Sequence, residues 1–205
     1  MTVGAIILAA GAATRMGAPK QLLRYQGKTL IERCIWQALE ARLDPVVVVV
    51  GAGAREIRAA ITGQPVEVVE NPAWQSGMGS SLNAGMRGLA ETGAELKAVA
   101  VLLADQPRVL AEHLSAMRQL LQAGSVPAVA ALYSGGLGVP AFFSRELFGA
   151  LAGLPPEAGA RQLLRGSGLQ VAAYPLPEAA VDIDTPEDFA RLQETREGED
   201  APVQG

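Results

Sequence analysis

Short, mostly apolar segments recur along the chain and alternate with longer segments whose apolar residues follow a helical spacing. Apolar runs of this length are typical of buried strands. We expect strands at residues 3–9, 46–50, 66–70, 98–104, 128–132, 139–143 and 169–174. We expect helices at residues 30–43, 54–62, 80–89, from the 105–107 segment to about 123, 145–152 and 160–165, and a last helix from residue 186.

Capping patterns mark two of the helix starts. Thr29 stands three residues before Glu32, as in a capping box, and Thr185 is followed by a proline at the first helical position. Apolar strands that alternate with helices predict an α/β fold, namely a three-layer, doubly wound, mostly parallel sheet with helices on both faces. In such sheets ligands bind at the carboxyl ends of the strands, so the residues that follow each strand are the first candidates for chemistry.

Length and charge narrow the class of protein. At 205 residues the chain corresponds to one domain, which we place at residues 1–196, followed by a flexible polar tail at 197–205. The net charge of −4 argues against nucleic-acid binding. No apolar run reaches about 18 residues and no signal peptide is evident, so no membrane association is predicted. A single cysteine cannot form an internal disulfide, and a cytoplasmic location is expected.

The first strand is followed by a loop of small residues that ends in a lysine. Its sequence is Leu-Ala-Ala-Gly-Ala-Ala-Thr-Arg-Met-Gly-Ala-Pro-Lys, from Leu8 to Lys20. Free backbone N–H groups in such a loop suit a polyphosphate, and Arg15 and Lys20 add positive charge. The spacing between Gly11 and Gly17 fits neither the Walker loop nor Gly-x-Gly-x-x-Gly. The residues favour phosphate binding, with an ordinary turn as the alternative.

Two further loops are less specific. Gly51-Ala-Gly-Ala begins like a dinucleotide fingerprint, but Glu56 occupies the third glycine position, so we interpret the two glycines as a tight turn. The loop at residues 71–79 carries Trp74 among adaptable polar groups. Trp74 could contact a base or ribose, or it could be wedged under the loop as core.

Two aspartates stand directly after predicted strands or before a predicted helix. The chain has only six aspartates, against fifteen glutamates, and only three lysines, against fourteen arginines. An Asp or Lys at such a position is therefore less likely to occur there by chance. Asp105 can bind a divalent metal or cap the following helix. Asp184 precedes Thr185, which already serves as the cap, so Asp184 is free to act as a second metal ligand. The alternative is that Asp184 only places a negative charge near the start of the helix.

The classical nucleophiles and bases are nearly absent from this pattern. The only histidine, His113, lies within a predicted helix and is assigned a surface or packing role. The only cysteine, Cys34, lies on the apolar face of its helix and is assigned to the core. We therefore expect any catalysis to depend on charge and position rather than on covalent chemistry.

Taken together, these motifs resemble the molybdenum cofactor cytidylyltransferases, or MobA-like NTP transferases, within the nucleotidyltransferase superfamily. Five pieces occur in family order, at residues 8–20, 71–82, 105–107, 138–143 and 182–188, and the resemblance covers about residues 3–193. The resemblance implies the fold of the nucleotide-diphospho-sugar transferases, with a nucleotide-binding part at about 1–107 and a substrate-binding part at about 108–196. The chain departs from the family pattern Gly-Asp-x-Gly-Ala-Arg at residues 156–161, where it reads Pro-Glu-Ala-Gly-Ala-Arg.

The resemblance also implies a role for individual residues. The nucleotide would be bound by Leu8, Ala9, Ala10, Gly11, Arg15, Lys20, Ser81 and Asp105. Of these, Arg15, Lys20 and Asp105 would be catalytic, and Asp105 with Asp184 would hold Mg²⁺. Gly138, Pro140 and Arg161 would contact a pterin substrate. Leu-Ala-Ala-Gly resembles the cytidylyl branch rather than the guanylyl branch, so Ala10 carries the choice of base.

The implied activity is transfer of CMP from CTP to molybdopterin with release of pyrophosphate. A molybdenum hydroxylase or its chaperone is the implied partner for the product. The alternatives are a guanylyltransferase, a transferase acting on another sugar or alcohol phosphate, a molybdopterin-binding protein without catalysis, and a redox protein with a dinucleotide site.

Overall fold

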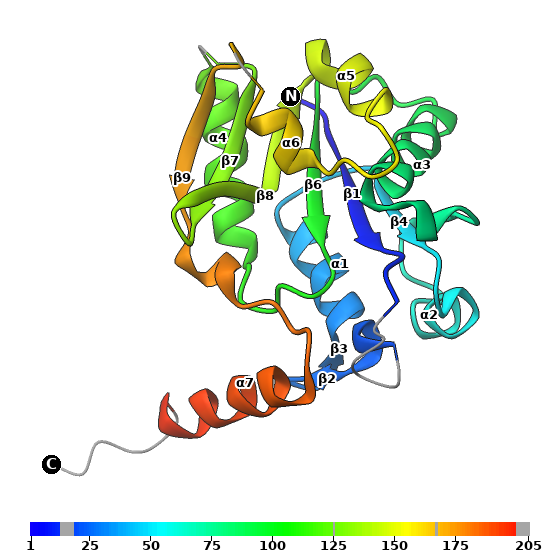
Figure 1. The fold of residues 1–205 in the computed structure, drawn as a ribbon, viewed down its shortest axis with the longest axis vertical. Helices are drawn as coiled ribbons and strands as arrows, with labels where there is room; N and C mark the ends of the chain where they lie inside the picture. The colour runs from blue at the N-terminus through cyan, green and yellow to red at the C-terminus, as the bar shows by residue number, and fades with distance from the viewer. Residues whose placement is uncertain (13–18, 125, 167, 200–205) are drawn as a thin grey trace, which may run out of the picture.

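The apolar segments form a mixed sheet at the centre of the protein (Figure 1). The computed structural model describes residues 1–12, 19–124, 126–166 and 168–199. The strands are β1 (Val3–Ala9), β2 (Arg24–Tyr25), β3 (Lys28–Thr29), β4 (Val46–Val50), β5 (Glu67–Glu70), β6 (Ala98–Leu103), β7 (Ala128–Tyr133), β8 (Gly136–Ser144) and β9 (Val171–Pro175). Seven of them form the main sheet in the order β5-β4-β1-β6-β8-β7-β9, and β2 pairs with β3.

All main-sheet pairs are parallel except those of β8, which runs antiparallel to β6 and β7. Ser134 and Gly135, the two residues between β7 and β8, have φ angles of 49° and 74°. Positive φ at both positions is the geometry of the tight hairpin turns that match strand twist. The predicted mostly parallel sheet is therefore confirmed, with this hairpin as its antiparallel element.

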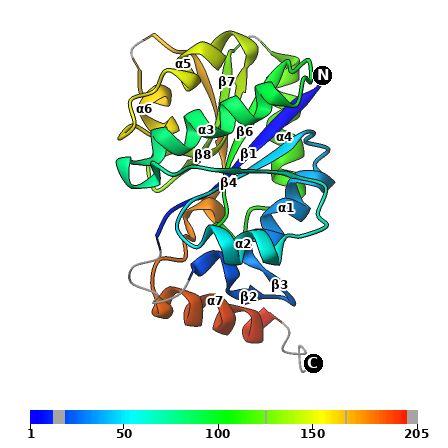
Figure 2. The same ribbon diagram turned by 90° about the vertical axis from the view of Figure 1, so that its right-hand side faces the viewer.

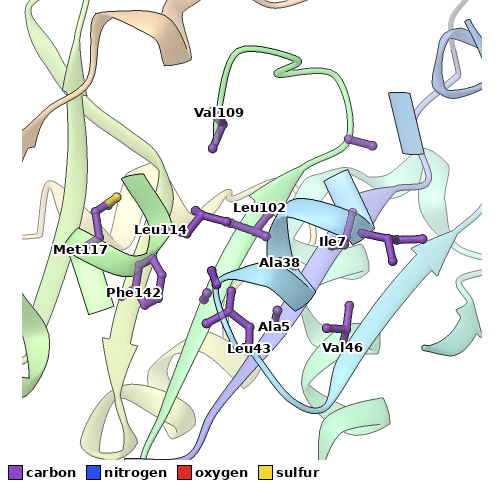
Figure 3. Packing of buried hydrophobic residues seen from close by; sticks show 14 of the residues in the cluster. Ala5, Ile7, Ala38, Leu43, Val46, Leu102, Val109, Leu114, Met117 and Phe142 are labelled. Carbon is purple, nitrogen blue, oxygen red and sulfur yellow. The ribbon is translucent and has the colours of Figure 1, made fainter. Parts of the chain in front are cut away.

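Helices cover both faces of the sheet (Figures 1 and 2). They are α1 (Leu30–Glu40), α2 (Ala54–Ala60), α3 (Met78–Glu91), α4 (Ala111–Ala123), α5 (Phe148–Ala152), α6 (Ala160–Leu164) and α7 (Pro186–Glu199), with short 3₁₀ turns η1 (Lys20–Leu22), η2 (Trp74–Ser76), η3 (Arg145–Leu147) and η4 (Pro177–Ala180). Side chains alternate along β1, so Ala5 and Ile7 pack with α1, α2 and α4, whereas Ile6 and Leu8 pack with α3, α5 and α6. Figure 3 shows the first of these two cores.

A third, small apolar cluster lies beside the main domain. Phe189 and Leu192 of α7 pack with Tyr25 and Leu30 and with the fully buried Ile183. Both views place α7 alongside β2 and β3 (Figures 1 and 2). The cluster therefore joins the segment after Lys20 to the segment after Asp184. Within the described ranges, no helix has the length and apolar character needed to cross a membrane.

Both predicted capping patterns are confirmed, but several predicted boundaries are wrong. Thr29 and Glu32 cap each other reciprocally at α1, and Thr185 Oγ1 accepts from the Asp188 amide at α7. Helix α1 ends at Glu40, before the predicted residue 43, because Arg42 turns into the left-handed region with φ 56°. Helix α3 begins at Met78, two residues earlier than expected.

Asp105 is not a helix cap. Helix α4 begins only at Ala111, and its amino end is closed by His113, whose Nδ1 accepts from the Leu110 amide at 3.2 Å. The capping alternative for Asp105 is therefore wrong, and His113, for which a surface or packing role was expected, caps the amino end of α4.

Candidate active site

A cleft of about 510 Å³ opens where β1 and β6 end. It is lined by Leu8, Ala10, Gly11, Ala12, Lys20, Gln21, Trp74, Gln75, Gly77, Met78, Ser81, Leu103, Ala104, Asp105 and Asp184. Residues from four separate sequence motifs thus meet in one cavity at the carboxyl edge of the sheet, as the doubly wound fold predicts. Ala9 lies at the end of β1 with its side chain buried, and Arg15 lies outside the described residues.

Lys20 brings the two aspartates together. Its Nζ lies 2.6 Å from Asp105 Oδ2 and 2.6 Å from Asp184 Oδ1. The side chains of Lys20 and Asp105 are only 14% and 18% exposed, whereas that of Asp184 is 55% exposed. One ammonium group therefore bridges two carboxylates that are 79 residues apart in the sequence.

Backbone contacts hold Asp184 at this point. The amide of Ile183 donates to the carbonyl oxygen of Asp105 at 3.2 Å, which ties the two acidic segments together. Asp188 Oδ2 accepts from the amides of Asp184 and Thr185, at 3.2 and 2.9 Å, and from the Thr185 hydroxyl. The start of α7 therefore fixes the turn from which the Asp184 side chain reaches Lys20.

The bridge keeps the lysine protonated. Burial alone would lower the pKa of Lys20, but attraction by Asp105 and hydrogen bonds to Asp105 and Asp184 outweigh it, so that this pKa is raised above its usual value. The ammonium ion thus remains a full positive charge throughout the physiological pH range.

Gln21 supports the glycine loop and was missed by the sequence analysis. Its side chain is 3% exposed, and its Nε2 donates to the carbonyl oxygens of Ala9 and Gly11 at 3.1 and 3.2 Å. These bonds fix the backbone where β1 passes into the loop. In the sequence, only its position next to Lys20 pointed to Gln21, because the spacing of residues does not show that a side chain contacts the end of a strand.

The opposite wall carries Trp74 and Ser81. Trp74 is half-buried and packs against the backbone of Gly51, where an added Cβ would lie 2.7 Å from the tryptophan Cβ. The Nδ2 of buried Asn71 donates to Ser80 Oγ and Ser81 Oγ, at 2.8 and 3.0 Å. Trp74 is therefore both wedged under its loop and part of the cleft wall, and Gly51 serves close packing.

The predicted substrate residues divide into two groups, and none lines the cleft described above. Arg161 donates to the Tyr133 hydroxyl at 3.3 Å, and the Gly138 backbone lies against the same tyrosine. Pro140 lines a small internal void together with Cys34. Gln106, which was not predicted, donates from Nε2 to the carbonyl oxygens of Val139 and Ala179 and so joins the Asp105 loop to β8.

Cys34 is half-buried and packs against the first of the two cores. Burial, together with the charge of Asp105, raises the pKa of its thiol to about 12. A thiol that stays protonated at neutral pH is a poor nucleophile.

The two carboxylates fit a divalent cation. Asp105 Oδ1 is buried and has no hydrogen-bond partner within the part of the chain that the structure describes. Carboxylate oxygens are the ligands that Mg²⁺ and Mn²⁺ prefer. No group of three acidic, histidine or cysteine ligands occurs among the described residues. A bound ion would therefore complete its shell with water and phosphate oxygens, as Mg²⁺ commonly does.

This combination of fold and site defines a nucleotidyltransferase: a mostly parallel sheet whose first loop is glycine-rich and whose carboxyl edge carries an acidic pair. Residues 5–173 match the sequence model of the MobA-like NTP transferase domain, and the chain belongs to this family. The family resemblance expected from the sequence is therefore confirmed.

Relatives of the chain carry different names. The purine catabolism protein PucB of Bacillus subtilis is 33% identical over 90% of this chain and 92% of its own length. Nicotine blue oxidoreductase of Paenarthrobacter nicotinovorans is 35% identical over 70% of this chain and 82% of its own length.

Solved structures confirm the fold. The crystal structure of Rv0371c from Mycobacterium tuberculosis H37Rv superposes with a TM-score of 0.80 and 29% identity, covering 94% of this chain and 98% of that one. A second crystal structure of Rv0371c is a complex with manganese; it has a TM-score of 0.75 and covers 95% and 100% of the two chains. A divalent metal is therefore bound by a relative with this fold.

Proposed function

We propose that the protein transfers CMP from CTP to the terminal phosphate of molybdopterin or of its metal-loaded form, with release of pyrophosphate. The observation that carries this proposal is the convergence of Lys20, Asp105 and Asp184 beside the loop that follows β1. The choice of CTP rests on Ala10, which lines the cleft. Its methyl group narrows the space for a base, which favours a pyrimidine over a purine.

The reaction requires charge neutralisation rather than a protein base. A phosphate oxygen of the acceptor attacks the α-phosphorus of CTP, and the bond from that phosphorus to the pyrophosphate oxygen breaks. The attacking phosphate is already an anion near pH 7. Lys20, together with Arg15, offsets the charge that grows on pyrophosphate. A Mg²⁺ ion held by Asp105 and Asp184 would reduce the repulsion between the two polyanions.

The two halves of the proposed domain have separate tasks. Residues 1–107 would bind the nucleotide, through the backbone of Leu8–Gly11 and the hydroxyl of Ser81, and residues 108–196 would bind the acceptor. Gly138 and Arg161, which lie together against Tyr133, are proposed to contact the pterin side of the acceptor, with Pro140 supporting that strand.

The test is incubation with molybdopterin and, in turn, CTP, GTP or ATP, with pyrophosphate and the dinucleotide product measured together. CTP should give both products. GTP-dependent product would indicate the guanylyl alternative, and molybdopterin binding without pyrophosphate would indicate a binding protein. Because one relative is named an oxidoreductase, a fluorescence titration with NADH belongs in the same series. Saturable NADH binding would support that redox alternative.

Single substitutions test the roles. Asp105→Asn should lower turnover by about 100-fold or more while the fold persists, because it removes a charged ligand from the proposed metal site. Lys20→Ala should weaken CTP binding and slow the chemical step. Pyrophosphate release by purified Asp105→Asn at a near-normal rate would contradict the proposed site.

A further inference from the structure

The Lys20 ammonium ion occupies the space between the two carboxylates that are proposed to bind the metal. It lies 2.6 Å from one oxygen of each, in the position that a shared cation would take. Within the described residues, the recorded ion pairs of Asp105 and Asp184 are with Lys20 alone. The acidic pair is therefore already partly neutralised by the chain itself.

This arrangement sets a competition between two cations. A divalent ion on Asp105 and Asp184 would stand within a few ångströms of the ammonium group, and Coulomb repulsion at that distance is large where water is scarce. The site is mostly buried on the Lys20 and Asp105 side. The ion could use Asp105 Oδ1, which is buried and without a partner among the described residues, but it would meet the lysine charge beside it.

A triphosphate offers the lysine another partner. Lys20 lines the cleft and stands at the end of the loop that follows β1, so its long side chain can turn from the carboxylates toward phosphate oxygens in the same cavity. That movement transfers one positive charge from the acidic pair to the nucleotide. Both carboxylates are then available to the metal.

We propose that Lys20 is an internal counter-ion that blocks metal binding until a nucleotide triphosphate draws it away. This inference rests on the proposed function and adds an order of events: the metal enters with the triphosphate and not before it. The acidic pair is then never left without a cation at any stage of the cycle.

Binding of Mn²⁺ without nucleotide, followed by electron paramagnetic resonance, tests the inference. Lys20→Met should bind Mn²⁺ at least about tenfold more tightly than the unmodified protein, because the competing charge is gone. Lys28→Met is the matched control: it removes the same charge from an exposed position on β3 and should leave Mn²⁺ affinity within about twofold. Adding Asp105→Asn to Lys20→Met should abolish the gain.

Equal or weaker Mn²⁺ binding by Lys20→Met would overturn the inference, as would an equal gain in Lys28→Met. Circular dichroism establishes that each variant is folded, and Lys20→Gln, which is also neutral and more polar, replaces Lys20→Met if that variant is unfolded. Pyrophosphate release by the unmodified protein is measured separately. If the unmodified protein releases pyrophosphate but Lys20→Met shows no gain in Mn²⁺ affinity, the counter-ion proposal is wrong and the proposed reaction stands. If Lys20→Met shows the gain but the unmodified protein releases no pyrophosphate, the proposed reaction is wrong and the counter-ion proposal stands.

Discussion

Gly79 allows the first turn of α3 and the 155–158 loop to touch, and Gly79→Ala should separate them. An added Cβ would lie 2.5 Å from the Ala158 carbonyl oxygen and 3.0 Å from that of Pro156, and it would overlap the carbonyl oxygen of Pro155. Real Cβ contacts essentially never fall below 3.0 Å. Because the obstacles are backbone atoms, a side-chain rotation cannot relieve the clash, and the loop must move by about 1 Å for the Pro155 carbonyl oxygen to clear the methyl group.

The cost follows from overpacking. Forcing a methyl group into a filled contact costs about 1–3 kcal/mol. For a protein of this size, 2 kcal/mol corresponds to a fall of about 4–8 °C in the unfolding midpoint. Ser81 lies in the same first turn of α3, so kcat/KM for the nucleotide should fall about 10- to 100-fold, since displacements approaching 1 Å have effects of that order.

The assay is thermal unfolding beside steady-state pyrophosphate release, with Gly149→Ala as the control. Gly149 is an exposed helical glycine in α5 whose added Cβ would meet nothing within 4 Å. That substitution should raise stability by about 0.4–1 kcal/mol and leave activity unchanged. A midpoint for Gly79→Ala equal to that of the unmodified protein would refute the packing argument. A lowered midpoint with unchanged kcat/KM would refute the link between this contact and the proposed role of Ser81.

Three further predictions concern titratable groups. Asp188→Ala should lower the free energy of unfolding by about 1 kcal/mol, because the α7 cap is lost, and should lower kcat, because Asp184 is no longer held in place. If Asp188→Asn restores more than half of the activity, the charge of Asp188 is dispensable. Cys34, with a thiol pKa of about 12, should resist a disulfide reagent at pH 8 until urea unfolds the chain; rapid labelling of the native protein would contradict the raised pKa. Burial and the charge of Asp105 raise the pKa of Asp182 to about 6 from 3.8, so the folded state binds the extra proton and stability should fall as pH rises from about 4 to 6. Asp182→Asn should flatten that slope in midpoint measurements, and an unchanged slope would count against this assignment.

The elements that were predictable from sequence are those whose cause is local. The strands β1, β4 and β6 are continuous apolar runs, and the α1 cap depends on Thr29 and Glu32 alone. The start of α3 has no such signal: no side chain caps it, and Gly77 takes a φ of 121° against the backbone of residues 156–157. The early end of α1 at Glu40 likewise depends on a left-handed residue that is not glycine.

The candidate site divides in the same way. Asp105 and Asp184 were found because each lies beside a predicted strand or helix end, and Lys20 because it ends the loop of small residues; all three also belong to a scarce residue type. Gln21 and Gln106 were not found, because each donates to carbonyl groups of strands or turns brought near only by folding. The sequence indicates which side chains carry charge, but the glutamine side chains that hold the surrounding backbone in place can be identified only from the three-dimensional structure.

The second acid of the site lies outside the segment by which the family is recognised. The family match ends at residue 173, whereas Asp184 and α7 follow it and are attached through their own small apolar cluster. A chain trimmed to the matched residues would lose this carboxylate, together with the end of β9 and the buried Leu176 and Ala179. The same attachment means that a synthetic peptide spanning residues 174–205 could be supplied separately to such a trimmed chain and restore the missing group by complementation.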